Sequence, residues 1–165
     1  MAKDATLDIV SKVDLQEVKN AINQVEKELV QRFDLKGTGC KIEWDGEAIV
    51  NLTAPDDMKI KNVFMILQEK LIKRGISIKT LEEGNIEHAL GGAVKQEITI
   101  KQGIDKDYAK KINTIIKGTK LKVNSQIQED QLRLSGKSID DLREVMRILK
   151  ESDLDIDLQY INFRS

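Results

Sequence analysis

The triplet Gly136-Lys137-Ser138 has the residue types that end a phosphate-binding loop. In such a loop, backbone N–H groups and a lysine hold phosphate oxygens, and a serine or threonine hydroxyl holds a magnesium ion. The complete motif requires another glycine five positions before Gly136, where this chain has Gln131. The strand expected before the triplet is also antiparallel to its hairpin partner, whereas that fold uses a parallel strand. The sequence therefore argues against a P-loop nucleoside triphosphatase.

The same triplet precedes an expected helix and could still bind an anion. Ser138 and Asp141 have the spacing of a helix-capping pair. Free backbone N–H groups and the helix dipole favour negative charge at such a helix start. Lys137 and Ser138 are therefore candidate ligand-binding residues. The alternative, that Ser138 only caps the helix, stays open.

A cluster of lysines lies between positions 101 and 122, although the whole chain has a net charge of −1. Only Asp105 and Asp107 offset it, so this segment is locally basic. A basic segment can bind phosphates, or it can simply be a solvated surface. The lysines are Lys101, Lys106, Lys110, Lys111, Lys117, Lys120 and Lys122.

A hairpin expected over residues 121–134 has one polar side. Its members are Lys122, Asn124, Gln126, Gln128, Gln131 and Arg133. We expect Ile127 and Leu132 to face the core, which would place Lys122 and Arg133 together on the opposite face. Side-chain amides suit base edges, and cations suit phosphates. Alternatively, this face is only hydrated or packs against the other half of the chain.

Stacking groups are scarce, because the chain has six aromatic residues, and Phe33, Phe64 and Tyr108 fall on expected helices. Phe163 in the last strand is the best candidate for stacking on a base, with Arg164 beside it, although core packing would also explain Phe163. The full set of candidate ligand-binding residues is Lys101, Lys120, Lys122, Gln126, Arg133, Lys137, Ser138, Phe163 and Arg164.

Catalysis and metal binding have little support. The chain has one histidine, His88, and one cysteine, Cys40. One of each cannot supply a Cys/His zinc set, and no second histidine is available for a two-histidine metal site. We expect no enzymatic activity, no metal and no cofactor. A lone cysteine also excludes an intrachain disulfide, and no apolar run approaches the ~20 residues that cross a bilayer. We expect a cytoplasmic protein without a membrane partner.

The order of expected elements repeats once along the chain. Apolar periodicity and turn residues predict two successive β-α-β-β-α-β series. The first comprises a strand over 6–12, a helix from Asp14 to about Phe33, a hairpin over 42–52, a helix from 55 to 75 and a strand over 76–81. Residues 83–92 are expected to be a connector. The second comprises a strand over 94–103, a helix from 105, the hairpin over 121–134, a helix from 138 and a strand over 156–164. Two split β-α-β units of an α+β fold fit this order best.

The chain resembles the YajQ family along its whole length. The matching stretches are Asp8-Ile-Val-Ser-Lys-Val-Asp14 with Leu15-Gln16-Glu17, Arg32-Phe-Asp-Leu-Lys-Gly37, Leu71-Ile-Lys-Arg-Gly-Ile76, Lys101-Gln-Gly-Ile104, Lys120-Leu-Lys-Val123, Gln126-Ile-Gln128, Gly136-Lys-Ser138 with Asp141-Leu142, and Asn162-Phe-Arg164. The chain departs from the family pattern at Leu7, where the family often has Phe, at Glu129-Asp130 beside the polar hairpin face, and at Leu90-Gly91-Gly92.

The resemblance implies two ferredoxin-like βαββαβ domains that exchange their N-terminal strands. The first domain would comprise residues 13–102, and the second residues 1–12 plus 103–165. It also implies a non-catalytic nucleotide-binding protein, and some members of the family bind cyclic di-GMP. We therefore expect a regulatory effector that binds cyclic di-GMP or RNA. The alternative is a protein-interaction adaptor without a nucleotide ligand.

Overall fold

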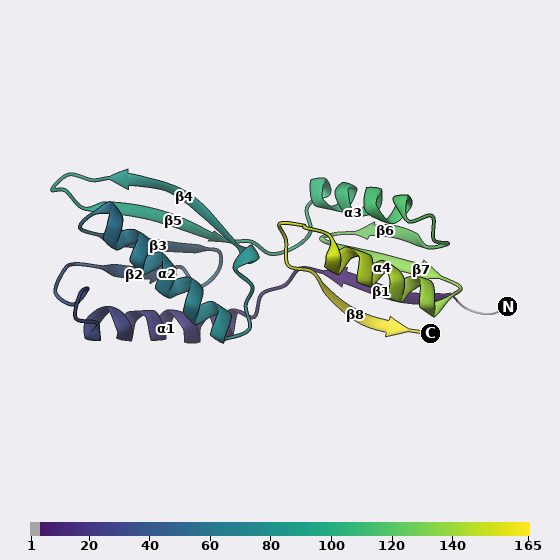
Figure 1. Ribbon diagram of the computed structural model, residues 1–165, viewed down its shortest axis with the longest axis horizontal. Coiled ribbons are helices and arrows are strands. Elements are labelled where there is room, and N and C mark those ends of the chain that lie inside the picture. The colour runs from purple at the N-terminus through teal and green to yellow at the C-terminus, as the bar shows by residue number, and fades with distance from the viewer. Residues whose placement is uncertain (1–3) are drawn as a thin grey trace. The chain divides into compact units, whose positions relative to one another are not determined.

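The computed structural model describes residues 4–165, which form two compact units. The central unit is Val13–Lys101, and the terminal unit combines the residues up to Lys12 with Gln102–Ser165. Each unit has one four-stranded antiparallel sheet and two α-helices (Figure 1). Each is described by itself below.

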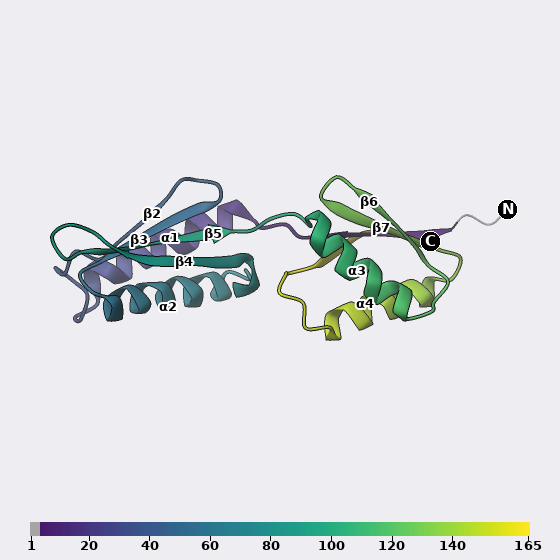
Figure 2. The same ribbon diagram turned by 90° about the horizontal axis from the view of Figure 1, so that it is seen from above.

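The sheet of the terminal unit has the strand order β6-β7-β1-β8. Its helices, α3 and α4, lie on the same side of this sheet (Figure 2). Its elements are β1 (Ala5–Val10), α3 (Lys106–Gly118), β6 (Asn124–Gln128), β7 (Gln131–Gly136), α4 (Ile139–Glu151) and β8 (Gln159–Arg164). The opposite side of the sheet therefore carries no helix of this unit.

The sheet of the central unit has the strand order β2-β3-β5-β4. A short 3-10 helix, η1 (Ile78–Thr80), precedes β4. The other elements are α1 (Leu15–Gln31), β2 (Lys41–Trp44), β3 (Ile49–Ala54), α2 (Asp57–Lys73), β4 (Leu81–His88) and β5 (Val94–Ile100).

The two units exchange strands. β1 directly precedes α1 in the chain, yet it pairs with β7 and β8 of the terminal unit. β5 directly precedes α3, yet it pairs with β3 and β4 of the central unit. With this exchange each unit has the βαββαβ arrangement of a ferredoxin-like fold. The predicted fold class is confirmed.

The expected helix starts are confirmed by their capping bonds. The Asp14 carboxylate accepts hydrogen bonds from the backbone N–H groups of Gln16 at 3.0 Å and Glu17 at 3.4 Å. The Asp105 carboxylate accepts one from the N–H of Tyr108 at 2.8 Å. These bonds satisfy N–H groups that have no partner within their helix, so they fix where α1 and α3 begin.

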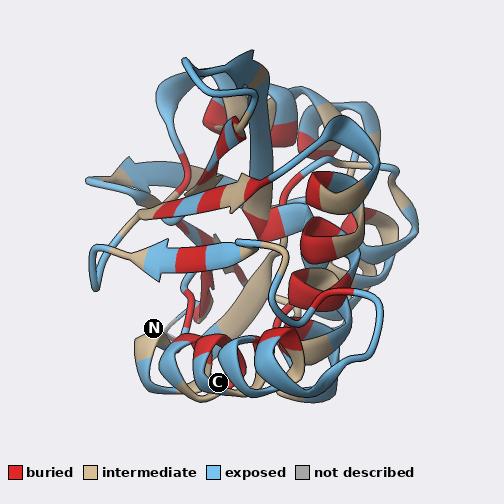
Figure 3. Ribbon diagram, turned by 90° about the vertical axis from the view of Figure 1, so that its left-hand side faces the viewer, coloured by how far each residue is buried: buried red, intermediate tan, exposed pale blue. Residues whose placement is uncertain are grey.

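Each unit has its own apolar core between its helices and its sheet (Figure 3). Helix residues three and four positions apart supply one side of each core, and alternate strand residues supply the other. In the terminal unit the fully buried members include Ile9, Ile112, Leu132, Leu134 and Leu142.

Two expectations about the central unit were wrong. Residues 76–81 are not a strand, because they contain η1, and most of the expected connector 83–92 belongs to β4. β4 is at an edge of its sheet, and most of its side chains are exposed. An edge strand with so few buried side chains gives no alternation of apolar and polar residues, which explains the error.

Two individual side chains also differ from expectation. Phe33 lies in the turn after α1, not in the helix, and is 94% exposed. Ile127 is on the helix side of its sheet, since it pairs with Leu132, but it is 50% exposed. β6 is an edge strand, so the core does not extend far enough to cover Ile127.

Candidate functional site

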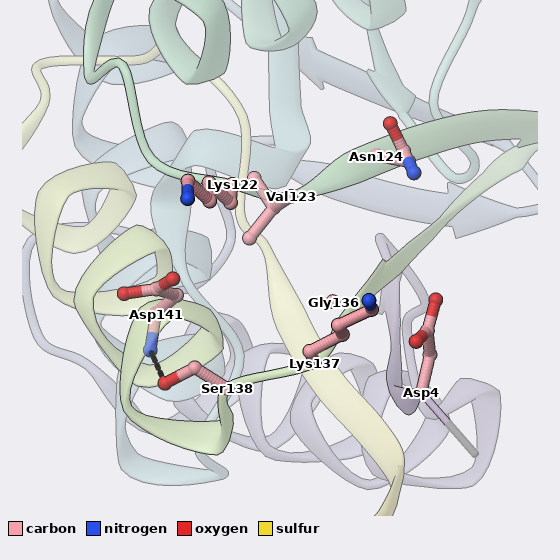
Figure 4. A pocket seen from close by; sticks show the side chains of 8 residues that line it. All are labelled: Asp4, Lys122, Val123, Asn124, Gly136, Lys137, Ser138 and Asp141. Atoms are coloured by element: carbon pink, nitrogen blue, oxygen red, sulfur yellow. Dashed lines mark hydrogen bonds between the residues drawn. The ribbon is translucent and has the colours of Figure 1, made fainter. Parts of the chain in front are cut away.

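A cavity of about 540 Å³ lies in the terminal unit, at the N-terminus of α4 (Figure 4). It brings together the segment before β6, the end of β7 and the residue before β1. We call it the α4 pocket. Its lining residues are Asp4, Lys122, Val123, Asn124, Gly136, Lys137, Ser138 and Asp141. Three of the nine candidate residues, Lys122, Lys137 and Ser138, therefore lie in one cavity.

Local packing explains two members of the Gly-Lys-Ser triplet. A Cβ atom on Gly136 would lie 3.0 Å from the backbone oxygen of Lys122 and 3.3 Å from a methyl group of Val123. Glycine therefore lets β7 end close to the segment before β6. The Ser138 hydroxyl accepts a hydrogen bond from the N–H of Asp141 at 3.3 Å, so Ser138 caps α4. Lys137 is the exposed member of the triplet.

The α4 pocket contains charges of both signs. Lys122 and Lys137 form no ion pair with any residue that the structure describes, so both ammonium groups are available to a ligand. Asp4 and Asp141 place carboxylates in the same cavity. In the view of Figure 4, Lys122 and Asp141 lie on one side and Lys137 and Asp4 on the other. The pocket can hold a ligand that combines phosphate oxygens with hydrogen-bond donors.

A buried carboxylate organises the sheet face that carries no helix. The Asp8 side chain is only 2% exposed, and Arg133 donates to it from Nε to Oδ1 at 2.8 Å and from Nη2 to Oδ2 at 3.2 Å. Asn162 donates from Nδ2 to Oδ2 at 2.8 Å. The Arg133 hydrogen bonds hold the pKa of Asp8 below its usual value, Asn162 adds to the effect, and burial opposes it.

The strand register places Gln126 opposite Arg133 and Arg133 opposite Asp8 on this open face. Lys122 is not part of the face, because β6 begins at Asn124. The expectation that Lys122 and Arg133 share a sheet face is therefore wrong. One edge of the Arg133 guanidinium, formed by Nε and Nη2, is bound to Asp8, and its side chain is 44% exposed. The polar side chains of the open face are therefore arranged around an ion pair within the protein, between Arg133 and Asp8.

The remaining candidate residues are dispersed. Phe163 lies beside Arg143 of α4, with the guanidinium carbon 5.9 Å from the ring centre, so its ring faces the helices and not the open face. Arg164 pairs with Thr6 at the end of β8. Lys120 follows the C-terminus of α3 with a positive φ of 59°. Lys101 belongs to the central unit.

Sequence reasoning missed three residues of these two regions. Asp4 lies before the first strand, where no periodicity marks it. Asp8 stands between Leu7 and Ile9 in a strand whose other residues, apart from Thr6, are apolar, and such a carboxylate is a signal for a buried partner. Asn162 is another partner of Asp8. Its φ is 55°, and the only sequence signal for this conformation is that asparagine tolerates it.

The central unit has a smaller cavity of about 290 Å³ beside β4 and β5. Its charged lining residues are two glutamates and one lysine, so it is less suited to an anion than the α4 pocket. The lining residues are Asn51, Gly84, Asn85, Glu87, Lys95, Gln96 and Glu97.

Within residues 4–165, no group of three or more histidine, cysteine, aspartate and glutamate side chains is placed to hold a metal ion. None of the helices in this part of the chain is both long enough and apolar enough to cross a membrane.

The fold and the pocket define a strand-exchanged pair of ferredoxin-like units with a cavity of mixed charge. A family model described as "Nucleotide-binding protein YajQ-like" matches residues 5–164. The chain belongs to this YajQ-like family. A protein of Alkaliphilus oremlandii named "Nucleotide-binding protein" is 58% identical to it, over 99% of this chain and 100% of that protein.

More distant relatives have the same description. A nucleotide-binding protein of Geobacter sp. strain M21 is 57% identical over 97% of this chain and 99% of its own length. One from Desulfitobacterium hafniense strain DCB-2 is 51% identical over 99% of this chain and 100% of its own length. The similarity therefore covers both units in each case.

Proposed function

We propose that this protein binds a nucleotide in the α4 pocket without transforming it. The observation that carries the proposal is the pair of ammonium groups, Lys122 and Lys137, that have no carboxylate partner and border the N-terminus of α4. A helix N-terminus with two lysines attracts phosphate oxygens. The names of the relatives point to the same class of ligand.

We propose binding without catalysis because the Gly136-Lys137-Ser138 triplet lacks the geometry of a hydrolytic loop. Gln131 replaces the first glycine of that motif, and β7, which ends at Gly136, is antiparallel to both of its partners, β1 and β6. Gly136 and Ser138 have structural roles in chain packing and helix capping. Binding without turnover fits a regulatory effector, whose ligand changes its interactions. We place this role in the cytoplasm, where such ligands are found.

The carboxylates of the pocket favour a base with N–H donors. Guanine offers a ring N–H and an exocyclic amino group on one edge, and Asp4 or Asp141 can accept from both. A guanine nucleotide therefore uses the lysines through its phosphate and an aspartate through its base. Cyclic di-GMP satisfies both requirements, and so does a guanosine within RNA.

Isothermal titration calorimetry with a panel of ligands tests the proposal. The panel contains cyclic di-GMP, GMP, AMP, a short RNA and inorganic phosphate. Lys137→Ala and Lys122→Ala should each weaken guanine-nucleotide binding by about 10- to 100-fold, the equivalent of about 1.5–3 kcal/mol for a hydrogen bond to a charged group. Lys61→Ala, an exposed lysine of the central unit, is the matched control and should leave the affinity unchanged.

Asp141→Asn tests recognition of the base separately. It should reduce the preference for GMP over AMP, while inorganic phosphate binds as before. Equal losses for Lys137→Ala and Lys61→Ala would overturn the pocket as the site. No binding of any nucleotide in the panel would overturn the proposal and leave the protein-interaction adaptor as the better explanation.

A further inference from the structure

A row of unpaired lysines runs along α3 toward the α4 pocket. Lys106, Lys110 and Lys117 lie within about 40° of one another around the helix axis, at 100° per residue. Lys120 and Lys122 follow in the chain after α3 ends, and we count them with the row because Lys122 lines the pocket. All five side chains belong to exposed residues. We call this row the lysine ridge.

No ion pair with a described residue neutralises the lysine ridge. Some cations elsewhere in the described chain do have a carboxylate partner: Lys70 contacts Glu28 at 3.0 Å, and Arg147 pairs with Glu144 and Glu151. Among residues 4–165 no carboxylate lies within 4.0 Å of any ridge ammonium group. Five like charges without counterions repel one another, and a polyanion would relieve that repulsion.

The side of α3 opposite the lysine ridge packs the helix against the rest of the terminal unit. Ala109, Ile112 and Ile116 are buried in the core of the terminal unit. Lys111 lies outside the ridge, 5.1 Å from the centre of the Tyr108 ring. Packing therefore does not require lysine at positions 106, 110 and 117, and their charge is available for a partner.

We propose that the lysine ridge binds the phosphodiester backbone of a polynucleotide strand. A protein partner fits less well, because lysine is depleted in protein interfaces and α3 has no large exposed apolar side chain to anchor one. The three lysines of α3 span about 16 Å along the helix, or about five nucleotides of a stacked strand at ~3.4 Å each. Lysine–phosphate contacts of this kind carry no sequence preference.

The inference deepens the proposed function, and it rests on that function only at the pocket end of the ridge. The ridge extends the ligand from a single nucleotide to a strand that leaves the pocket along α3. A dinucleotide is too short to reach Lys106. The ridge and the pocket can therefore be tested separately with ligands of different length.

The test is a fluorescence-anisotropy titration of a labelled 12-nucleotide RNA, and of DNA of the same sequence, at a series of salt concentrations. The variant is Lys106→Gln/Lys110→Gln/Lys117→Gln in the full chain. The matched control, Lys19→Gln/Lys27→Gln/Lys61→Gln, removes the same charge from exposed helix positions of the central unit. Circular dichroism checks that both variants are folded.

The ridge variant should lose affinity for RNA by more than about tenfold at low salt. Its slope of log affinity against log salt should be shallower than wild type by about 2, because each lost phosphate contact on a single strand removes about 0.7. The control should retain the wild-type slope, and both variants should bind cyclic di-GMP as the wild type does. A similar change with RNA and DNA supports recognition of the backbone.

Equal effects of the two triple variants would overturn the ridge and indicate only diffuse charge attraction. Absence of RNA and DNA binding by the wild type at low salt would also overturn it. Either result leaves the pocket standing if cyclic di-GMP still binds. If the wild type binds RNA but does not bind cyclic di-GMP, the pocket is overturned and the ridge stands.

Discussion

Arg133 holds the buried carboxylate of Asp8 through two hydrogen bonds, at 2.8 and 3.2 Å, although 125 positions separate the two residues in the chain. The contact joins β1, from the N-terminal end of the chain, to β7. β1 enters the terminal unit only because the strands are exchanged, so this ion pair links the topology of the fold to the chemistry of its open face.

The Asp8–Arg133 pair should make stability depend on acid. The folded state lowers the pKa of Asp8, so the ion pair contributes fully above the ordinary aspartate pKa of about 3.9 and is lost as the pH falls through the lowered value. Asp8→Asn should cost about 1–2 kcal/mol at pH 7, given that Arg133 is partly exposed. Urea unfolding at several pH values measures the difference between wild type and variant. A difference that stays constant from pH 7 to pH 2 would contradict this account.

Asn162 should tolerate glycine better than alanine. Its φ is 55°, a conformation that glycine adopts freely and alanine resists. Both substitutions remove the hydrogen bond to Asp8, so the comparison isolates the backbone. Asn162→Ala should be less stable than Asn162→Gly by about 1 kcal/mol in chemical denaturation. The register between β1 and β8 shifts at this point, between the pairs Asp8–Ile161 and Thr6–Arg164. Equal stabilities would show that β8 adjusts its backbone there without cost.

Gly84 and Gly118 should respond to alanine in opposite directions. A Cβ on Gly84 would lie 2.6 Å from the backbone oxygen of Glu97, which forces the β4–β5 pairing apart. Gly84→Ala should therefore destabilise the central unit by about 1–3 kcal/mol. Gly118 ends α3 with no atom within 4 Å of its Cβ position, so Gly118→Ala should be neutral or stabilising by up to about 1 kcal/mol. Thermal unfolding of the two variants measures this difference. A Gly84→Ala protein as stable as the wild type would contradict the prediction.

Ser138→Ala should lower stability more than it lowers phosphate affinity. The hydroxyl accepts the N–H of Asp141 as the cap of α4, and loss of a cap costs about 0.5–2 kcal/mol. Lys137→Ala, at an exposed position beside it, should show the reverse pattern. Thermal unfolding and GMP titration of both variants measure the two quantities. A stable Ser138→Ala protein that fails to bind GMP would make the hydroxyl a ligand contact.

Local sequence signals predicted most of the elements but not their partners. Asp14, Asp105 and Ser138 mark helix starts because a side-chain oxygen there replaces a missing backbone acceptor. The prediction of strand exchange came from the family resemblance. The residue alternation of β1 could not supply it, because that alternation is the same whichever sheet the strand joins. β4 was missed because Ile86 is one of only two of its eight side chains that are even partly buried.

The pocket was only partly predictable, because local sequence identifies some of its residues and not others. Lys137 and Ser138 are adjacent in the chain and stand at a helix start, so local sequence identifies them. Asp4 reaches the pocket only because β1 pairs with β7, a contact between distant segments that no local pattern encodes. Lys122 was expected on the open face, and only the observed start of β6 at Asn124 moves it into the pocket.

A ¹⁵N–¹H correlation spectrum of the full chain, recorded during titration with cyclic di-GMP and, separately, with GMP, locates the nucleotide site residue by residue. If the nucleotide binds in the α4 pocket, the largest shift changes fall on the backbone amides of residues 122–124 and 136–141 and follow one saturable binding curve. Lys137→Ala should weaken that curve, and Lys61→Ala should not. An absence of shift changes, or changes concentrated around Gly84 in the central unit, would contradict the assignment of the pocket as the nucleotide site.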